Sequence, residues 1–264
     1  MDRHENCYVR DVKSMAKISI DINEIANGLE QIGYIISDRI ERDNNGTNWQ
    51  LKFSNSGAIV TIYDTNNKKN SVVNGKCEVG EAESLKEIVD GLKCKELQVS
   101  DINSKIVDLI NSNREDYFYD FKREWVTDNK SGDLLHDILC LSNNIENREA
   151  YLIIGVTDSY EVIGVDDWKK SNELFDWLRT IEFAGDKKPE IELIKVYYKY
   201  KKIDVLVLKK SNNIPFYIDR NYKGVNPFQI YTRVGDTNTP KNSQACYAYV
   251  EKLWELHFNN KNEE

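Results

Sequence analysis

The stretch YLIIGVTDSYEVIGVD, residues 151–166, joins a short apolar run to a polar loop. Its first six residues carry no charge, and a run of this length is typical of a strand in a sheet buried on both faces. The loop brings Thr157 and Asp158 to the carboxyl end of that strand, where α/β sheets usually place functional side chains. Asp158 has a second interpretation as an ordinary turn residue. The stretch predicts a buried sheet with functional residues at one edge.

The rest of the second half alternates strand-like and helix-like runs. We expect a strand in DYFYDFKREW, a hairpin from IELIKVYYKY into KIDVLVLKK, and a strand in QIYTRVGD. Helices are expected in SGDLLHDILCLSNNI, in residues 172–181 and in QACYAYVEKLWELHF, because apolar residues recur there at helical spacing. These elements predict a mixed α/β domain over residues 113–258.

The first half has a different order of elements. Helical runs at DINEIANGLEQIG and EAESLKEIVDGL enclose four strand-like runs, YIISDRIER, NWQLKFSN, GAIVTIYDT and residues 71–75. This order predicts a small antiparallel sheet covered by helices over residues 15–98, with a linker helix at residues 99–112. The whole chain is therefore assigned to the α+β class. The first sheet resembles the TATA-binding-like sheets of some ribonucleases, and we expect it to bind substrate or a partner.

Composition excludes several classes of protein. No apolar run approaches the roughly 20 residues that span a bilayer, and the start MDRHENCYVRDVK is too polar for a signal peptide. We therefore expect a cytoplasmic protein without a membrane partner. The five cysteines lack CxxC spacing, which argues against a disulfide framework or a zinc site. Three histidines make a histidine-pair ribonuclease mechanism a poor fit.

Charge is unevenly distributed. The net charge of −8 argues against broad nonspecific binding to nucleic acid. Residues 187–223, however, interleave lysines with tyrosines, a pattern that suits RNA because rings stack on bases and cations hold phosphates. The alternative is a solvated hairpin.

The stretch REDYFYDFKREW, residues 114–125, contains the candidate catalytic residues. Side chains alternate on a strand, so Asp120 and Lys122 are predicted to stand side by side on one face. An acid two residues from a lysine suits metal-dependent nucleases, because the carboxylate binds a hard cation and the lysine stabilises phosphate charge. Glu115, five residues before Asp120, is a second possible ligand. The alternative is an ordinary ion pair.

In combination, these motifs resemble the Schlafen-type AlbA domain over residues 113–240. The resemblance rests on the acids around Asp-Phe-Lys, the helix LLHDILCLSNN, the strand and loop YLIIGVTDSYEVIGV, and the later runs VLVLKKSNNIPFYI and IYTRVGD. It implies a ribonuclease that cuts transfer or ribosomal RNA, with Mg²⁺ or Mn²⁺ held by Glu115, Asp120 and Asp158. Lys122 would orient the attacking water or neutralise the transition state.

Two positions depart from the family pattern. Asp120 replaces the family's longer glutamate, so the position of a metal would shift. The family's paired glycines after the helix are replaced by residues 143–150, NNIENREA, which weakens a nucleotide-binding interpretation because glycines permit close approach to phosphate.

The leading hypothesis is a metal-dependent endoribonuclease that cleaves structured RNA, with tRNA as the expected substrate, and that serves as a toxin or antiviral defence effector. The predicted RNA contacts are Lys199, Lys201, Lys202, Lys209, Lys210, Tyr231 and Arg233. A homodimer and an antitoxin or regulatory protein are possible partners. The alternatives are a noncatalytic nucleotide- or DNA-binding regulator, and an interaction protein whose acids pair internally with Lys122 and Arg233.

Overall fold

The computed structural model describes residues 21–44, 46–63 and 68–261. The chain divides into two compact units, one built around Ile36–Gln98 and the other around residues 99–261 together with Gly28–Ile35. Residues 15–20 of the predicted first domain lie outside the described residues, as does Cys7.

The first unit contains a four-stranded antiparallel sheet with the strand order β1-β2-β3-β4. Its strands are β1 (Ile36–Glu41), β2 (Asn48–Phe53), β3 (Gly57–Tyr63) and β4 (Val72–Lys76). Alternate side chains of β3 are buried, as the period of two in its sequence predicts. Helix α2 (Glu81–Lys93) packs on β3 and β4 with an apolar stripe that includes Leu85 and Ile88. Helix α1 (Ile22–Gln31) precedes the sheet and also has a buried apolar side.

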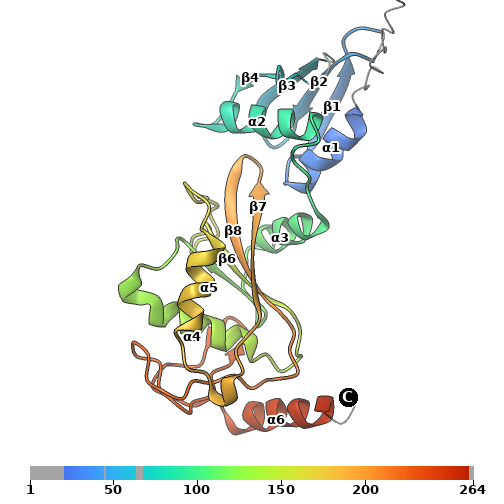
Figure 1. Ribbon diagram of the computed structural model, residues 1–264. Helices are drawn as coiled ribbons and strands as arrows, with labels where there is room; N and C mark the ends of the chain where they lie inside the picture. Colours follow the sequence, from blue (N-terminus) through green and yellow to red (C-terminus); the bar gives the residue numbers. More distant parts are fainter. Residues whose placement is uncertain (1–20, 45, 64–67, 262–264) are drawn as a thin grey trace, which may run out of the picture. The chain divides into compact units, whose positions relative to one another are not determined.

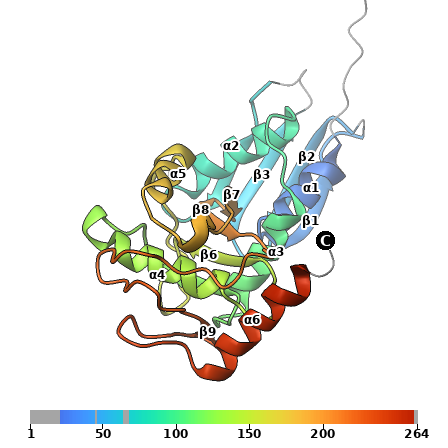
Figure 2. The same cartoon turned by 60° about the horizontal axis from the view of Figure 1, so that its bottom comes forward.

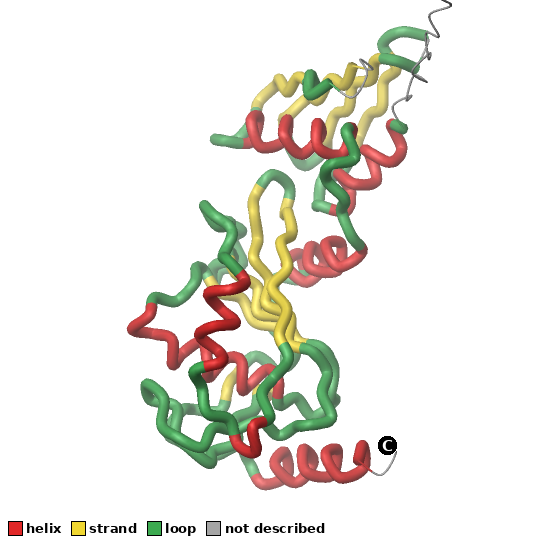
Figure 3. The backbone as a smooth tube through the Cα atoms, viewed as in Figure 1, coloured by secondary structure: helices red, strands yellow, loops and turns green. Residues whose placement is uncertain are grey.

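The second unit is built on a mixed sheet with the strand order β5-β6-β8-β7. Strand β5 (Tyr119–Lys122) is parallel to β6 (Ala150–Ile154), which is antiparallel to β8 (Lys201–Leu208). Strand β7 (Ile191–Tyr198) pairs with β8 in the long hairpin shown in yellow in Figure 3. All five residues of β6 are buried, so the apolar run YLII, residues 151–154, forms an inner strand of this sheet, as predicted.

Helices cover both faces of this sheet (Figures 1 and 2). Helix α4 (Ser131–Ser142) contacts β6 and β8, and its apolar residues join Leu152, Ile154 and Leu206 in one core. Helix α5 (Ser171–Arg179) contributes Leu174 and Leu178 to the same core. Helix α3 (Asp101–Asn111) contacts β7, and it packs Ile106 and Ile110 into a second core with the rings of Tyr119 and Phe121.

The segment after β8 consists mainly of loops. The sequence predicts a strand across residues 229–236, but only Arg233–Val234 forms one (β9), paired with Thr237–Asn238 (β10). Side chains take the place of strand partners here, since Ile230 N donates to Gln244 Oε1 at 3.0 Å. Strand β5 is likewise shorter than the ten residues of DYFYDFKREW, because a turn from Asp116 to Tyr119 precedes it.

The remaining elements complete the second unit. Two short 3₁₀ turns, Asp128–Lys130 and Ala184–Asp186, and helix α6 (Tyr247–Lys261) belong to it. Helix α6 is anchored by the buried Leu253 and by His257, whose Nδ1 lies 2.8 Å from the carbonyl oxygen of Ile214. Within the described part of the chain, every cysteine is a free thiol. No helix in that part has the length and apolar character needed to cross a membrane.

Candidate functional site

Asp120 and Lys122 lie on the edge strand β5 with their side chains on one face of the sheet. The register places Asp120 beside Leu152 and Lys122 beside Ile154, and those two apolar residues face the core under α4. Asp120 is therefore buried, while Lys122 Nζ lies 2.7 Å from Asp120 Oδ2 and the lysine side chain is 33 % exposed. The alternation in the sequence correctly predicts this pair.

Arg233 reaches the same place from a distant part of the chain. At the end of α4, Asn143 is completely buried and its Nδ2 donates to the carbonyl oxygens of Phe216 and Tyr231, at 2.8 and 3.0 Å. Its Oδ1 accepts from Phe216 N at 2.6 Å. The Asn143 side chain therefore holds the backbone of Tyr231, two residues before Arg233. Asn143, the first residue of the NNIENREA segment, thus has a structural function.

The guanidinium group of Arg233 is almost fully enclosed by acceptors. Its Nη2 lies 2.6 Å from Glu115 Oε2 and 3.1 Å from Asp120 Oδ1. Its Nε donates to the carbonyl oxygen of Asp116 at 2.9 Å, and its Nη1 donates to Asn238 Oδ1 at 2.9 Å. The side chain is 2 % exposed. Arg233 therefore pairs with Glu115, which precedes the Asp-Phe-Lys motif, and with Asp120, the first residue of that motif.

A third carboxylate, Asp137 of α4, completes the network. Its Oδ2 lies 3.3 Å from Lys122 Nζ, and its Oδ1 accepts from Asn238 Nδ2 at 2.8 Å. Asn238 therefore bridges Asp137 and Arg233. We call the set of Glu115, Asp120, Lys122, Asp137, Arg233 and Asn238 the β5 network; it contains three carboxylates and two cations.

Burial, together with the neighbouring carboxylates, raises pKa values in the β5 network. Burial raises the pKa of Asp137 to about 6, against the lowering effect of Lys122 and with a further raising effect from Asp120. Burial and the neighbouring Asp120 also raise the pKa of Glu115. Although burial alone would lower it, the carboxylates of Asp137 and Asp120 raise the pKa of Lys122 to about 12. Lys122 is therefore a permanent cation whose position is fixed by two acids.

Asp158 is not part of the β5 network. Strand β6 ends at Ile154, and the next residue, Gly155, has φ +112° and an added Cβ there would lie 3.0 Å from the backbone of Gly164. The loop then closes on itself, because Thr157 N donates to the carbonyl oxygen of Glu161 at 2.9 Å. Asp158 lies exposed at the tip of this turn, as its alternative interpretation predicts.

The arrangement does not fit the three-carboxylate metal site that the sequence predicts. Among the described residues, no three Asp, Glu, His or Cys side chains form a group that could hold a metal ion. Oxygens of Glu115 and Asp120 face Arg233 instead, and Asp120 Oδ2 faces Lys122. The positive charge that a metal would supply is therefore provided by two side chains.

The predicted RNA contacts are distributed over three places. Tyr231 is fully buried, and its hydroxyl donates to Gln229 Oε1 at 2.8 Å; Arg233 belongs to the β5 network. These two predictions need correction, because neither side chain is at the surface. Lys209 lies between Glu149 and Glu192, at 3.2 and 2.8 Å.

The other predicted lysines lie at the two ends of the hairpin. Lys210 is exposed at the end near Lys209. Lys199, Lys201 and Lys202 lie at the far turn, where Lys201 Nζ donates to the carbonyl oxygen of Val162 at 2.8 Å. The lysine-rich run therefore does not form one continuous patch.

Sequence reasoning missed Asp137 and Trp168. Asp137 is detectable in principle, because it replaces an apolar residue in the stripe of Leu134, Ile138 and Leu141 on α4. Trp168 packs edge-on against Tyr197 with ring centroids 5.6 Å apart, and Lys195 Nζ lies 5.6 Å from its ring. Nothing in the local sequence indicates that a tryptophan in a loop would meet the β7–β8 hairpin.

Comparison with known families supports the resemblance seen in the sequence. Residues 115–242 match the family model described as Schlafen, AlbA_2. No curated protein matches the chain. The matched range contains β5, α4, β6, the β7–β8 hairpin and β9. It also contains every residue of the β5 network, from Glu115 to Asn238.

Proposed function

From the premise that residues 115–242 form a Schlafen-type AlbA domain, and thus belong to a family of nucleases and nucleic-acid-binding proteins, we propose that the chain is an endoribonuclease. Its proposed substrate is structured RNA, of which tRNA is the first to test. The observation that carries the proposal is Lys122, a permanent cation held at the surface by two buried carboxylates.

The geometry of Lys122 suits phosphate chemistry. An ammonium group that is fixed before the substrate arrives needs no reorganisation to stabilise the charge that develops on a phosphate. Asp120 and Asp137 hold the Nζ atom at 2.7 and 3.3 Å, and the side chain still reaches solvent. Glu115 is 20 % exposed, and burial together with the neighbouring Asp120 raises its pKa, which is the direction that suits a carboxyl group acting as a general acid or base.

Dependence on Mg²⁺ or Mn²⁺ is a separate part of the proposal. Glu115 and Asp120 could ligate a cation only if Arg233 Nη2 left them, since it lies 2.6 and 3.1 Å from their oxygens. Asp158 would also have to move from the tip of its turn. We therefore assign no catalytic step to a metal, and we propose the dependence as a property to be measured.

A second candidate function is binding of nucleic acid without cleavage. It is favoured by Arg233, which is 2 % exposed and neutralises the two acids that a nuclease would use. In that case the ion pairs of the β5 network only stabilise the fold, and the chain acts as a regulator or as an interaction protein.

Cleavage of total tRNA by the purified full chain separates the two candidates. We expect discrete fragments with Mn²⁺ or Mg²⁺, none with EDTA, and none from Asp120→Asn, which keeps the shape of the side chain but removes its charge. Asp219→Asn is the matched control, because Asp219 is an exposed loop acid. Intact tRNA and ribosomal RNA under all conditions, with measurable RNA binding, would favour the noncatalytic candidate.

Asp158→Asn tests the third ligand in the same assay. Loss of cleavage together with metal dependence would assign Asp158 to the site despite its exposed position. Unchanged cleavage would exclude it. Fragments that persist in EDTA would remove the metal from the proposal and leave the β5 network as the catalytic centre.

A further inference from the structure

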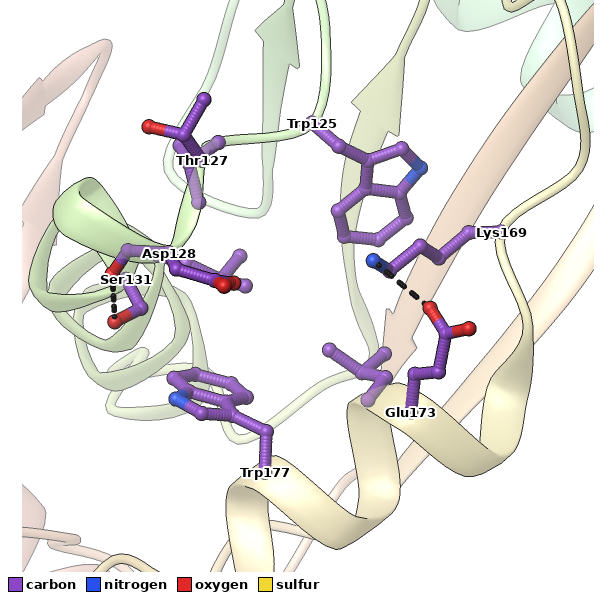
Figure 4. A pocket seen from close by; sticks show the side chains of 10 residues that line it. Trp125, Thr127, Asp128, Ser131, Lys169, Glu173 and Trp177 are labelled. Atoms are coloured by element: carbon purple, nitrogen blue, oxygen red, sulfur yellow. Dashed lines mark hydrogen bonds and ion pairs between the residues drawn. The ribbon is translucent and has the colours of Figure 1, made fainter.

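A pocket of about 270 Å³ lies in the second unit, lined in part by the segment between β5 and α4 and by residues of α4. It is shown in Figure 4, where Trp125 and Trp177 stand on opposite sides of the space. The lining residues are Trp125, Val126, Thr127, Asp128, Ser131, Leu134, Lys169, Glu173, Leu174 and Trp177. Its volume is just below the about 300–1,000 Å³ of pockets for drug-sized molecules, so it suits one flat ring system.

Both indole rings of the pocket are held in place by hydrogen bonds from their N–H groups. Trp125 Nε1 donates to Asp204 Oδ2 at 2.7 Å, and Asp204 is completely buried. Trp177 Nε1 donates to the hydroxyl of Tyr222 at 2.7 Å. Because their N–H groups are already used, the rings offer only aromatic surface to a ligand. Fixed aromatic rings lose little conformational entropy on binding.

Two charged groups of opposite sign point into the space between the rings (Figure 4). Lys169 Nζ lies 3.3 Å from Glu173 Oε2, and an ammonium has three donors, so it can serve a ligand as well. Asp128 is exposed, and within the described residues no hydrogen bond or ion pair engages its carboxylate. The pocket therefore presents an acceptor and a donor beside two aromatic surfaces.

We propose that this pocket binds a nucleobase, with guanine preferred. A base stacks on aromatic side chains through its faces, and its edge is read by hydrogen bonds. Guanine has two adjacent donors, N1–H and N2–H₂, that match the carboxylate of Asp128, and its O6 acceptor matches Lys169. The base is supplied by an unpaired nucleotide of RNA or by a free nucleotide.

The position of the pocket gives it a role in the proposed function, on which this part of the inference rests. Trp125 follows Lys122 by three residues, and three extended residues span at most about 11 Å. A base held at Trp125 therefore brings its own phosphate groups close to the fixed ammonium of Lys122. The pocket would select which phosphodiester of the RNA lies at the β5 network.

Binding of single nucleotides tests the pocket directly. The full chain is titrated with GMP, AMP, CMP and UMP, and tryptophan fluorescence is followed. We expect saturable quenching, with GMP bound at least about tenfold more tightly than UMP. Absence of saturable quenching with all four nucleotides, and with the oligonucleotide described below, would overturn the proposal.

Three variants locate the binding. Trp177→Ala is expected to weaken GMP binding by at least about tenfold, the effect of losing one stacking partner. Trp168→Ala, the same change at a ring outside the pocket, is expected to have no effect. Asp128→Asn alters an exposed side chain and should fold normally; it is expected to remove the preference for GMP. Equal losses in Trp168→Ala and Trp177→Ala, or an unchanged preference in Asp128→Asn, would contradict the proposal.

An oligonucleotide distinguishes the two sources of the base. A uridine tetranucleotide with one internal guanosine should bind more tightly than GMP, and more weakly as salt rises, if RNA is the source. GMP bound more tightly than the oligonucleotide would indicate a free nucleotide. Both results support a nucleobase pocket.

Failure of this inference can be told apart from failure of the proposed function. GMP binding that weakens in Trp177→Ala and loses its preference in Asp128→Asn, together with intact RNA in the cleavage assay, supports the pocket and removes the nuclease. Cleavage with the same kcat/KM and the same fragments in Asp128→Asn and the wild-type chain, with no nucleotide binding, removes the pocket and leaves the nuclease.

Discussion

The β5 network and the lysines of the β7–β8 hairpin are two charged regions of the same unit that differ in burial. In the β5 network, Arg233 is 2 % exposed and Asp120 is 5 % exposed, and each charge contacts at least one charge of opposite sign. Along the hairpin, Lys209 pairs with glutamates that are 42 % and 53 % exposed, while Lys201 and Lys202 donate to loop carbonyls. Both regions are rich in charge in the sequence, but only in the first are an arginine and its acidic partners largely buried, with Lys122 as the more exposed member.

This difference teaches that burial, not the number of charges, decides how strongly a charge is coupled to the fold. Surface ion pairs contribute about 0–1 kcal/mol because water and salt screen them. A buried pair costs several kcal/mol if one partner is removed, since the other charge stays desolvated. Substitutions in the two regions should therefore differ several-fold in their effect on the free energy of unfolding.

Arg233→Met is expected to lower the free energy of unfolding by about 3–5 kcal/mol, because it leaves Glu115 and Asp120 without their shared cation. Urea denaturation at neutral pH measures the change. The matched control is Arg220→Met, since Arg220 pairs with Glu182 at 2.9 Å but is 78 % exposed; a change under about 1 kcal/mol is expected. Equal effects of the two variants would contradict the comparison.

Asp137→Asn is expected to remove a pH dependence of stability. The pKa of Asp137 is raised to about 6 in the folded chain, against about 3.9 unfolded. The folded state therefore binds more protons between these values, so its free energy of unfolding falls as pH rises from about 4 to about 6, by on the order of 2 kcal/mol. Above about pH 7, where Asp137 is deprotonated in both states, this contribution stays constant.

Urea denaturation between pH 4 and pH 8 measures this slope, with Asp219→Asn as a control that should retain it. A slope that persists unchanged in Asp137→Asn would assign the titration to another acid, of which Glu115 is the first candidate because its pKa is also raised.

The double variant Lys201→Ala, Lys202→Ala is expected to weaken RNA binding severalfold while leaving stability within about 1 kcal/mol of the wild type. Each lost phosphate contact should reduce the slope of log K against log salt by about 0.7 for single-stranded RNA. Lys209→Ala is the control inside the same hairpin, because Glu149 and Glu192 already neutralise its charge. An equal loss of slope in the control would contradict the assignment.

Asp158→Asn is expected to change the free energy of unfolding by less than about 0.5 kcal/mol, the usual range for an exposed side chain. Asp158 lies at the tip of a turn whose hydrogen bonds are made by Thr157 and Glu161. Urea denaturation again provides the measurement. A loss of more than about 2 kcal/mol would place Asp158 in a buried network like that of β5.

Much of the second sheet could be predicted from the sequence, because its signals are local. The period of two in residues 117–122 predicts which side chains share a face, and it correctly pairs Asp120 with Lys122. The uniform apolar character of β6 predicts burial on both faces. Prediction was wrong for the length of the strand around Arg233. The backbone of Ile230 and Tyr231 is bonded by the side chains of Gln244 and Asn143 and belongs to no strand.

The sequence by itself determined the alternation of elements, the side-by-side placement of Asp120 and Lys122, and the family motifs, since each depends on residues within a few positions of one another. Only the tertiary structure decided that Arg233 would neutralise Glu115, 118 positions away, and that Asp137 would join Lys122. It also decided that Trp125 and Trp177 would lie on opposite sides of one pocket. These contacts depend on how segments that are distant in the sequence pack around one core. Local periodicity carries no information about that packing.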